Sequence, residues 1–203
     1  MKKFLALLFA LILALPLCAC GGGNREQDFS HIGKGPRVVI TLQDGRTMTA
    51  VLYPDVAPLT VENFLTLVDQ KAYDGVIFHR VIPGFMVQTG YLKAKDNQLT
   101  GAVNANTIPG EFTSNGFVNE LEHKAGVLSM ARAEHPDSAS SQFFICVERY
   151  AYGDGNYAAF GELVNQKSLD VAVSISRVLT GAKYMFERDV PIEDVIIKSI
   201  RRK

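Results

Sequence analysis

A cluster of polar side chains interrupts one of the most apolar stretches of the chain, residues 78–90, which read FHRVIPGFMVQTG. Arg80 lies among phenylalanine, valine, isoleucine and methionine, with His79 and Gln88 as its polar neighbours. Burying an unpaired guanidinium costs several kcal/mol or more, so a plain core strand would not contain one. Arg80 is therefore expected either to reach solvent or to be held beside an apolar pocket for a chemical purpose.

The sequence lacks the motifs of the common catalytic and cofactor sites. It has no H-E-x-x-H, no paired-cysteine metal motif and no phosphate-binding G-x-x-x-x-G-K. The four histidines share no ligand spacing, and Ser140 and Ser141 lack the G-x-S-x-G pattern of a nucleophile elbow. No metal, nucleotide or other cofactor is expected.

What remains is a set with no evident nucleophile or base: Arg80, Gln88, Gln142 and several Phe and Met side chains. These side chains can bind an apolar ring and hold hydrogen-bond donors against an amide. The set suits a reaction that only rotates a bond.

Short strands and two helices must position these side chains. Residues 38–42 and 47–53 flank Asp44-Gly45 and predict a β-hairpin. Apolar residues at helical spacing predict an amphipathic helix within APLTVENFLTLVDQ, with Thr60 as its N-cap, and a second helix over about 168–179.

The rest of the body reads as strands and loops. Strand-like segments are GVLSMAR, QFFICV and YAAFGELV, with VPIEDVIIKSI as the last strand, whereas residues 91–122 read as loops. Many short strands with two distant helices favour a closed β structure capped by helices.

The N-terminus has the layout of a secretory signal, with two lysines followed by an apolar run shorter than a membrane span. Leu17-Cys18-Ala19-Cys20 resembles a bacterial lipoprotein signal, in which residues 1–19 are removed and Cys20 is lipidated. The alternative is an ordinary secretory signal with two incidental cysteines. The expected organisation is a signal peptide over 1–19, a lipidated, flexible tether over 20–36 and one domain over 37–203, anchored to a membrane outside the cytoplasm.

Composition adds three expectations. Cys146 is the only cysteine beyond the anchor region, so no disulfide is expected within the domain, and Cys146 reads as a buried apolar side chain. Without Lys2 and Lys3 the chain has 19 basic and 21 acidic residues, a formal charge of about −2, which does not favour a nucleic-acid partner. We expect a monomer.

The motifs at 78–90, GVLSMAR at 126–132 and SSQFFI at 140–145 together resemble the cyclophilins, the cyclosporin-binding class of peptidyl-prolyl cis-trans isomerases. The likeness runs from about Arg37 to the C-terminus and includes YPDVAPLTVENF, IPGEF and AAFGELV. It implies a mainly β fold, an eight-stranded antiparallel closed β-barrel capped by two α-helices.

The resemblance also implies roles for individual residues. Arg80 matches the catalytic arginine, and Gln88 its polar partner. The residues matching positions that bind substrate are Phe85, Met86, Ala131, Arg132, Gln142, Phe144, Tyr152 and Tyr157. The partners implied are proline-containing polypeptides, and cyclosporin.

Four positions depart from the family pattern. Arg132 stands where many members have asparagine, and Tyr152 replaces the tryptophan of the cyclosporin site, so we expect weakened cyclosporin binding. Tyr91 stands where an aspartate usually closes the motif, and Tyr157 where histidine is frequent.

The prediction is a lipid-anchored isomerase that turns X-Pro bonds in exported proteins and assists their folding. The alternatives are a chaperone or docking module that binds proline segments with little catalysis, and a structural lipoprotein with a relic fold. Retention of Arg80 favours the isomerase, because a pure binder has less need of a donor aimed at a twisted amide.

Overall fold

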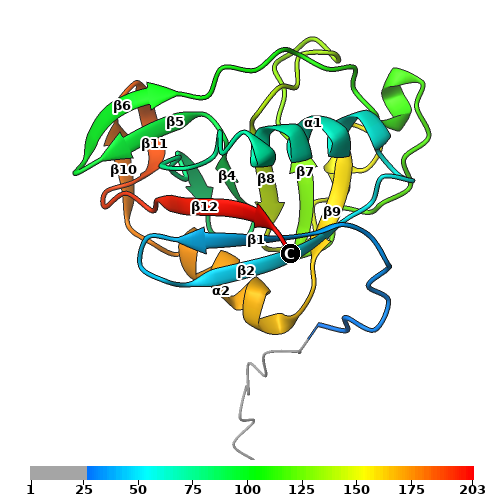
Figure 1. Cartoon of the computed structure of the whole chain (residues 1–203), viewed down its shortest axis with the longest axis horizontal. Coiled ribbons are helices and arrows are strands. Elements are labelled where there is room, and N and C mark those ends of the chain that lie inside the picture. The colour runs from blue at the N-terminus through cyan, green and yellow to red at the C-terminus, as the bar shows by residue number, and fades with distance from the viewer. Residues whose placement is uncertain (1–26) are drawn as a thin grey trace, which may run out of the picture.

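The computed structural model describes residues 27–203, and its main element is an eight-stranded antiparallel sheet (Figure 1). The strand order is β12-β1-β2-β9-β7-β8-β4-β3. The bounds are β1 (Arg37–Leu42), β2 (Thr47–Leu52), β3 (Arg80–Ile82), β4 (Met86–Thr89), β7 (Val127–Met130), β8 (Phe143–Cys146), β9 (Ala159–Leu163) and β12 (Ile197–Arg202). The predicted hairpin is confirmed, with Ile40 paired to Met48.

The sheet is curled but open, which corrects the expected closed barrel. β3 and β12 are its two edges, and no strand ladder joins them within the described residues. The segments that precede them meet at an isolated bridge between Ile77 and Ile196, and Ile197 also exchanges backbone hydrogen bonds with Gly75 and Val76 at 2.9 and 2.7 Å. The bridge does not extend into a ladder, because the chain turns at Gly75 (φ 80°) and β3 has only three residues.

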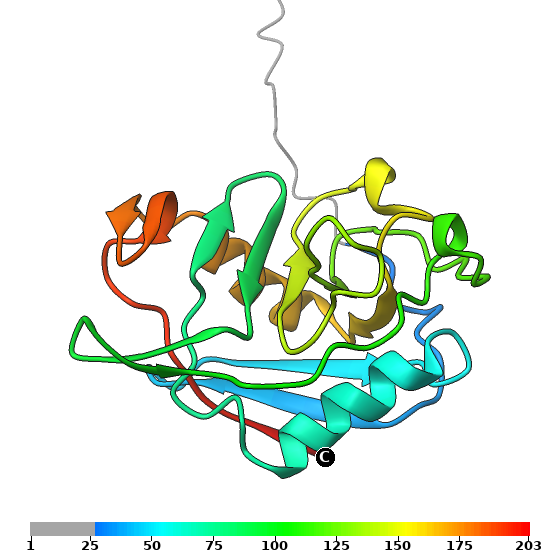
Figure 2. The same cartoon turned by 90° about the horizontal axis from the view of Figure 1, so that it is seen from above.

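Two α-helices lie on opposite sides of the curled sheet, α1 (Pro58–Asp69) and α2 (Gln166–Ser176) (Figures 1 and 2). Thr60 is not the N-cap of α1. The carboxylate of Glu111 instead accepts hydrogen bonds from the N–H groups of Leu59 and Thr60 at 2.9 and 2.8 Å. A distant acidic side chain therefore satisfies first-turn donors that the local sequence leaves open.

The second helix ends earlier than its apolar spacing predicts. Val178 and Leu179 lie beyond α2, and the Leu179 carbonyl accepts the Ile192 N–H at 2.9 Å. This bond begins a hairpin of β10 (Thr180–Lys183) and β11 (Phe186–Pro191). Residues 190–191 thus belong to β11, and the last strand starts only at Ile197.

The region expected to be loops over 91–122 contains another hairpin, β5 (Leu92–Lys95) and β6 (Gln98–Ala102). Its turn residues Asp96 and Asn97 both have positive φ, 53° and 58°. Asp and Asn tolerate this conformation better than other residues with side chains. Two short 3₁₀ helices complete the chain, η1 (Thr113–Asn115) and η2 (Ala151–Gly153).

The core lies inside the curl, where α1 covers one end. Phe64 of α1 meets Phe143 of β8 edge to face, with ring centroids 5.3 Å apart, and also contacts Phe160 and Tyr73. Fully burying an aromatic side chain of this size stabilises a fold by about 1.5–3 kcal/mol. Because strand side chains alternate, Phe143 and Ile145 point into this core while Phe144 points to the other face.

The N-terminal part of the described chain contacts the domain. Gln27 donates from its backbone N–H to Gln166 Oε1 at 3.1 Å and from its side chain to the Ala125 carbonyl at 2.7 Å. Phe29 packs against the core, and His31 Nε2 lies 3.2 Å from Glu162 Oε2. Residues 27–36, expected in the flexible tether, are therefore docked. The predicted signal peptide and the predicted lipidation site Cys20 lie outside the described residues.

None of the helices within residues 27–203 has the length and apolar character needed to cross a bilayer.

Candidate active site

Strand pairing brings the predicted polar and aromatic side chains into one row. Arg80 of β3 pairs with Gln88 of β4, Gln88 pairs with Phe144 of β8, and Phe144 pairs with Ser129 of β7. Directly paired residues in an antiparallel sheet share a face. The register thus gathers residues that are up to 64 positions apart in the sequence.

These side chains surround a cavity of about 230 Å³, which we call the Arg80 pocket. Eight of the ten predicted site residues line it. The lining residues are Arg80, Phe85, Met86, Gln88, Ala131, Arg132, Phe144, Tyr157 and, not predicted, Tyr150.

Met86 and Phe144 form the apolar floor of the pocket, being 1% and 5% exposed. The Tyr157 ring meets Phe144 edge to face at 5.7 Å, and Tyr150 closes the side at 4.6 Å from Phe85. Burial raises the pKa of Tyr150 to about 12, so its phenol stays neutral and able to donate at physiological pH. A small, flat apolar ring fits such walls better than a charged group does.

A buried histidine supports the floor from behind. His123 stacks on Phe144 at 6.0 Å, with its Nε2 2.8 Å from Ser129 Oγ and its Nδ1 3.1 Å from Asp154 Oδ1. Burial holds the pKa of His123 below its usual value. The ring therefore fixes the orientation of Phe144 without adding charge to the pocket.

A hydrogen bond orients the two glutamines predicted at the site. Gln88 Nε2 donates to Gln142 Oε1 at 3.0 Å, and the Gln142 carbonyl accepts the Ala131 N–H at 2.9 Å. Gln142 is thus held against the pocket, although it does not line the cavity itself. Because Gln88 donates through Nε2, its own side-chain carbonyl oxygen takes no part in the bond to Gln142.

Arg80 lies at the rim, with 45% of its side chain exposed. Its Nε is 3.9 Å from Asp189 Oδ2 of β11, which is a long contact. Among the groups that the structure describes, which do not include the Glu187 side chain, no hydrogen-bond acceptor for the guanidinium is found. Arg80 therefore does both things that the sequence allowed. Its aliphatic stem lies beside apolar side chains, and its charged guanidinium reaches the pocket and solvent.

His79, beside Arg80, is a packed structural side chain. It is 2% exposed and its ring stacks on Phe186 of β11 at 5.3 Å. Burial lowers its pKa to about 4, so the ring is neutral at physiological pH. His79 thereby links β3 to the hairpin that places Asp189 near Arg80.

Arg132 gives the pocket a second cation. Its guanidinium donates to the carbonyls of Asn156, Ala133 and Glu134 at 3.0–3.2 Å and lies about 5 Å from the ring centroids of Phe112 and Tyr157. Carbonyl oxygens fix its position without neutralising its charge. No carboxylate of the described chain pairs with it within 4.0 Å.

Two predicted positions have other surroundings. Tyr152 is 69% exposed and does not line the cavity, and the centroid of its ring lies 6.0 Å from that of Tyr150. Tyr91 meets His79 edge to face at 6.1 Å, behind the pocket. Gly90 has φ 95°, and an added Cβ would lie 2.3 Å from the Ser141 carbonyl, so the turn there depends on glycine.

Sequence reasoning missed three residues of the site: Tyr150, His123 and Asp189. Tyr150 begins the segment YAYGDGNY, whose tyrosines indicated one side of the substrate site. The sequence did not show which of these rings faces the pocket. The ring of His123 had no local signal, because its partners lie on other elements. Asp189 belongs to a hairpin that was not predicted.

Comparisons with known proteins agree with this geometry. Residues 37–202 match the family model for cyclophilin type peptidyl-prolyl cis-trans isomerases. A peptidyl-prolyl cis-trans isomerase A from Dickeya dadantii is 38% identical, over 98% of this chain and 97% of that protein. A bifunctional phosphatase/peptidyl-prolyl cis-trans isomerase, named as putative, from Streptococcus pyogenes is 40% identical over 82% of this chain, which matches 38% of that longer protein.

A solved structure shows the same fold. The Cryptosporidium parvum cyclophilin type isomerase, crystallised in the presence of the dipeptide Ala-Pro, superposes with a TM-score of 0.64 at 27% identity, covering 82% of this chain and 98% of that one. The chain therefore belongs to the cyclophilin family of peptidyl-prolyl cis-trans isomerases.

Proposed function

We propose that the Arg80 pocket accelerates cis-trans rotation of X-Pro bonds in exported polypeptides and so assists their folding. The observation that supports this most is the position of Arg80, whose side chain is 45% exposed at the rim of a pocket floored by Met86 and Phe144. The proline ring would occupy the floor, which brings its nitrogen toward Arg80.

The chemistry follows from the electronic structure of the amide. Partial double-bond character gives a rotation barrier of about 18–20 kcal/mol, and free X-Pro bonds exchange in about 10–100 s. At the twisted transition state conjugation is lost, and the prolyl nitrogen has a lone pair that accepts a hydrogen bond. Arg80 donates to that lone pair far better than to the planar ground state, which is differential transition-state binding.

The required acceleration is modest. Raising a rate of about 0.01–0.1 per second to about 1–1,000 per second needs about 1.4–7 kcal/mol. A dry apolar floor and a few aimed hydrogen bonds from Arg80 and Gln88 supply energies of that size. No proton transfer or covalent step is needed.

Substrate backbone would lie along Ala131 and Gln142, whose mutual hydrogen bond fixes that wall of the site. Phe85, Tyr157 and Tyr150 would confine the proline ring from the sides. Tyr152 would contact only larger ligands, which agrees with weakened binding of cyclosporin and nearly unchanged turnover.

We further propose that the mature protein is a monomer anchored by lipid at Cys20 on an extracytoplasmic membrane face. Gln27, seven residues after Cys20 in the sequence, contacts the domain. A Gly-rich tether of that length has a root-mean-square span of about 15 Å, so the domain would stay close to the bilayer. Cys20→Ala should release the protein from the membrane fraction and remove the acyl mass seen by mass spectrometry, whereas Cys146→Ala should change neither.

The isomerase is tested with the mature protein in detergent and a short Ala-Pro peptide. Arg80→Ala should lower kcat/KM by about 100-fold or more, the usual cost of removing an aimed transition-state donor. Arg80→Lys should recover only part of the loss, because an ammonium lacks the planar fork of donors. Arg177→Ala, at an exposed arginine beyond α2, is the control.

The result also separates the isomerase from a module that only binds proline segments. Wild-type protein that binds the peptide without speeding its isomerisation would contradict the proposal and establish the binding module.

A further inference from the structure

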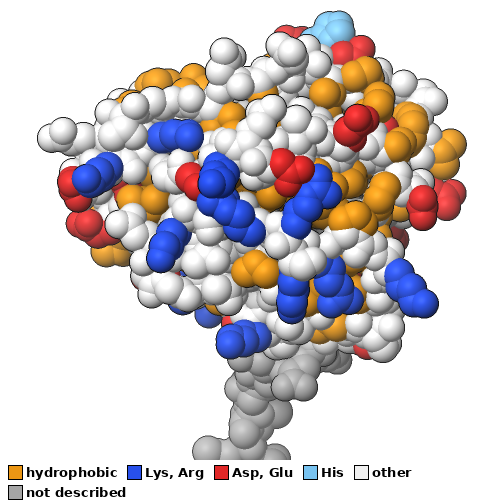
Figure 3. Space-filling view, viewed as in Figure 1, with side chains coloured by type: hydrophobic (Ala, Val, Ile, Leu, Met, Phe, Trp, Pro, Cys, Tyr) orange, Lys and Arg blue, Asp and Glu red, His pale blue; other side chains and the backbone are white. Residues whose placement is uncertain are grey.

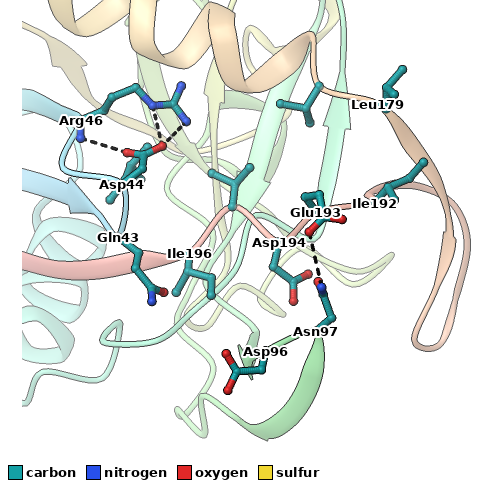
Figure 4. Close-up of a pocket in the computed structure, with 13 residues that line it drawn as sticks. Gln43, Asp44, Arg46, Asp96, Asn97, Leu179, Ile192, Glu193, Asp194 and Ile196 are labelled. Carbon is teal, nitrogen blue, oxygen red and sulfur yellow. Dashed lines mark hydrogen bonds and ion pairs between the residues drawn. The ribbon is translucent and has the colours of Figure 1, made fainter.

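A cavity of about 780 Å³, which we call the end groove, lies away from the Arg80 pocket, where several turns meet (Figure 4). Its walls come from the β1–β2 turn, the β5–β6 turn, the residues after α2 and the segment that leads into β12. None of its lining residues is shared with the Arg80 pocket. The groove is thus a separate feature that the isomerase chemistry does not use.

Exposed aliphatic side chains form one wall of the groove. Leu179 is 79% exposed and Ile192 is 52% exposed, and a backbone hydrogen bond of 2.9 Å holds them side by side. Val178 and Ile196 also line the cavity. Aliphatic surface held open in a groove with a polar rim is typical of a binding surface.

The rim of the groove is acidic. Asp96 and Glu193 are exposed; Glu193 accepts only a 3.5 Å hydrogen bond from Asn97, and Asp96 pairs with no cation of the described chain (Figure 4). The other two carboxylates are neutralised, Asp44 by Arg46 at 2.6 Å and Asp194 by Lys183 at 2.9 Å. Charge complementarity therefore favours a cationic ligand with aliphatic side chains.

The chain links the groove to the catalytic site. Asp189, whose carboxylate faces Arg80, lies three residues before Ile192. Three residues of extended chain span about 10 Å, so one extended polypeptide can reach both places. We propose that the end groove captures a segment of the same client polypeptide, one in which lysine or arginine alternates with leucine-like side chains, and that no proline is needed there.

A second copy of the chain is the competing occupant. Lysine and arginine side chains gather on the face seen in Figure 3, on the side where Figure 1 shows β1 and β12. That face is the less fitting partner, because two arginines of β12 are already paired: Arg201 with Asp74 at 2.7 Å and Arg202 with Asp69 at 2.5 Å. The continuity with Arg80 favours the client.

The test measures binding of a labelled, proline-free peptide of alternating leucine and lysine to the mature protein, by fluorescence anisotropy. Matched peptides carry glutamate in place of lysine, or serine in place of leucine. We expect saturable binding of the first peptide, roughly tenfold weaker binding of the other two, and weakening by added salt. Equal binding of all three peptides, or none by the first, would overturn the proposal.

Two variants locate the binding. Leu179→Ser with Ile192→Ser should weaken binding about fivefold or more, and Glu193→Lys about threefold, because the first removes the aliphatic wall and the second reverses a rim charge. Val118→Ser, at a 74% exposed apolar residue elsewhere, is the matched control. Unchanged binding in both groove variants would refute the site.

Two further readouts separate this inference from its alternatives. All the groove variants should isomerise a short Ala-Pro peptide as fast as the wild type does. The inference rests on the proposed function, because it takes the ligand of the groove to be a segment of the same polypeptide substrate. A wild-type protein without isomerase activity would count only against the proposed function. Sedimentation equilibrium should show a monomer. A dimer that the Leu179 and Ile192 substitutions abolish would assign the groove to a second copy and contradict the proposal.

Discussion

The Arg80 pocket and the end groove use opposite chemistry within one small domain. The pocket has aromatic walls and two cations, Arg80 and Arg132, whereas the groove has aliphatic walls and two unneutralised carboxylates, Asp96 and Glu193. The floor of the pocket is buried and supported from behind by His123, while Leu179 and Ile192 in the wall of the groove are mostly exposed. This difference fits two separate roles. The pocket holds one X-Pro bond in a fixed geometry for catalysis, and the groove binds another segment of the polypeptide weakly.

The largest expected difference between the two regions concerns stability. Phe144→Ala should lower the free energy of unfolding by about 3 kcal/mol, because it opens a cavity under His123, Tyr150 and Tyr157. Leu179→Ala should change it by less than about 0.5 kcal/mol, because that side chain is mostly in water. Denaturant titration followed by circular dichroism measures both. Similar losses would show that the pocket is no better supported than the groove.

The histidine beside Arg80 predicts a pH effect on stability. The pKa of His79 is about 4 in the folded protein and 6.5 in the unfolded chain. Below pH 6.5 the unfolded chain therefore binds a proton at His79 that the folded protein does not bind until about pH 4. Between pH 7 and pH 4 this should cost about 3 kcal/mol of unfolding free energy.

Comparison with variants isolates this contribution from the titration of other groups. The pH dependence of stability should be flatter in His79→Gln than in the wild type, and unchanged in His135→Gln, whose side chain is exposed. Parallel curves for the wild type and His79→Gln would contradict the assignment.

The second cation of the pocket predicts a charge preference in the substrate. Because Arg132 is held by carbonyls and not neutralised, a Glu-Pro peptide should be turned over faster than a Lys-Pro peptide. In Arg132→Gln the ratio of the two kcat/KM values should fall roughly fivefold, as expected for about 1 kcal/mol of attraction at the solvent-exposed rim. The same ratio in Arg177→Gln provides the control. A ratio that does not respond to Arg132 would show that its charge faces away from substrate.

The smallest effect is expected at Tyr152, which the sequence placed in the site and the structure places outside the cavity. Tyr152→Ala should change kcat/KM for a short peptide by less than about twofold, as at other exposed positions. Tyr150→Ala, at the ring that lines the pocket, should have the clearly larger effect. The reverse order would mean that the two rings exchange places when substrate binds.

Much of the site could be predicted because its motifs resemble those of the cyclophilins. The structure gives the physical reason that the motif residues meet: Met86, Gln88 and Phe144 share a face once β4 pairs with β8. The fold class, the first hairpin and the buried face of α1 followed from residue periodicity.

What could not be predicted depends on contacts between distant parts of the chain. Glu111 caps α1 from 51 residues away, which no local pattern reveals. The hairpin formed by β10 and β11 is set by the bond between Leu179 and Ile192, and only that hairpin brings Asp189 to Arg80. The open edge of the sheet likewise depends on the three-residue length of β3.

The central claim is that rotation of the X-Pro bond depends on Arg80 and not on the groove. The most direct measurement compares Arg80→Ala with the Leu179→Ser, Ile192→Ser double variant, side by side, for isomerisation and binding of one short Ala-Pro peptide. Arg80→Ala should lose about 100-fold or more in catalysis with binding nearly intact, and the groove variant should match the wild type. Catalysis that survives in Arg80→Ala, or falls equally in both variants, would contradict the claim.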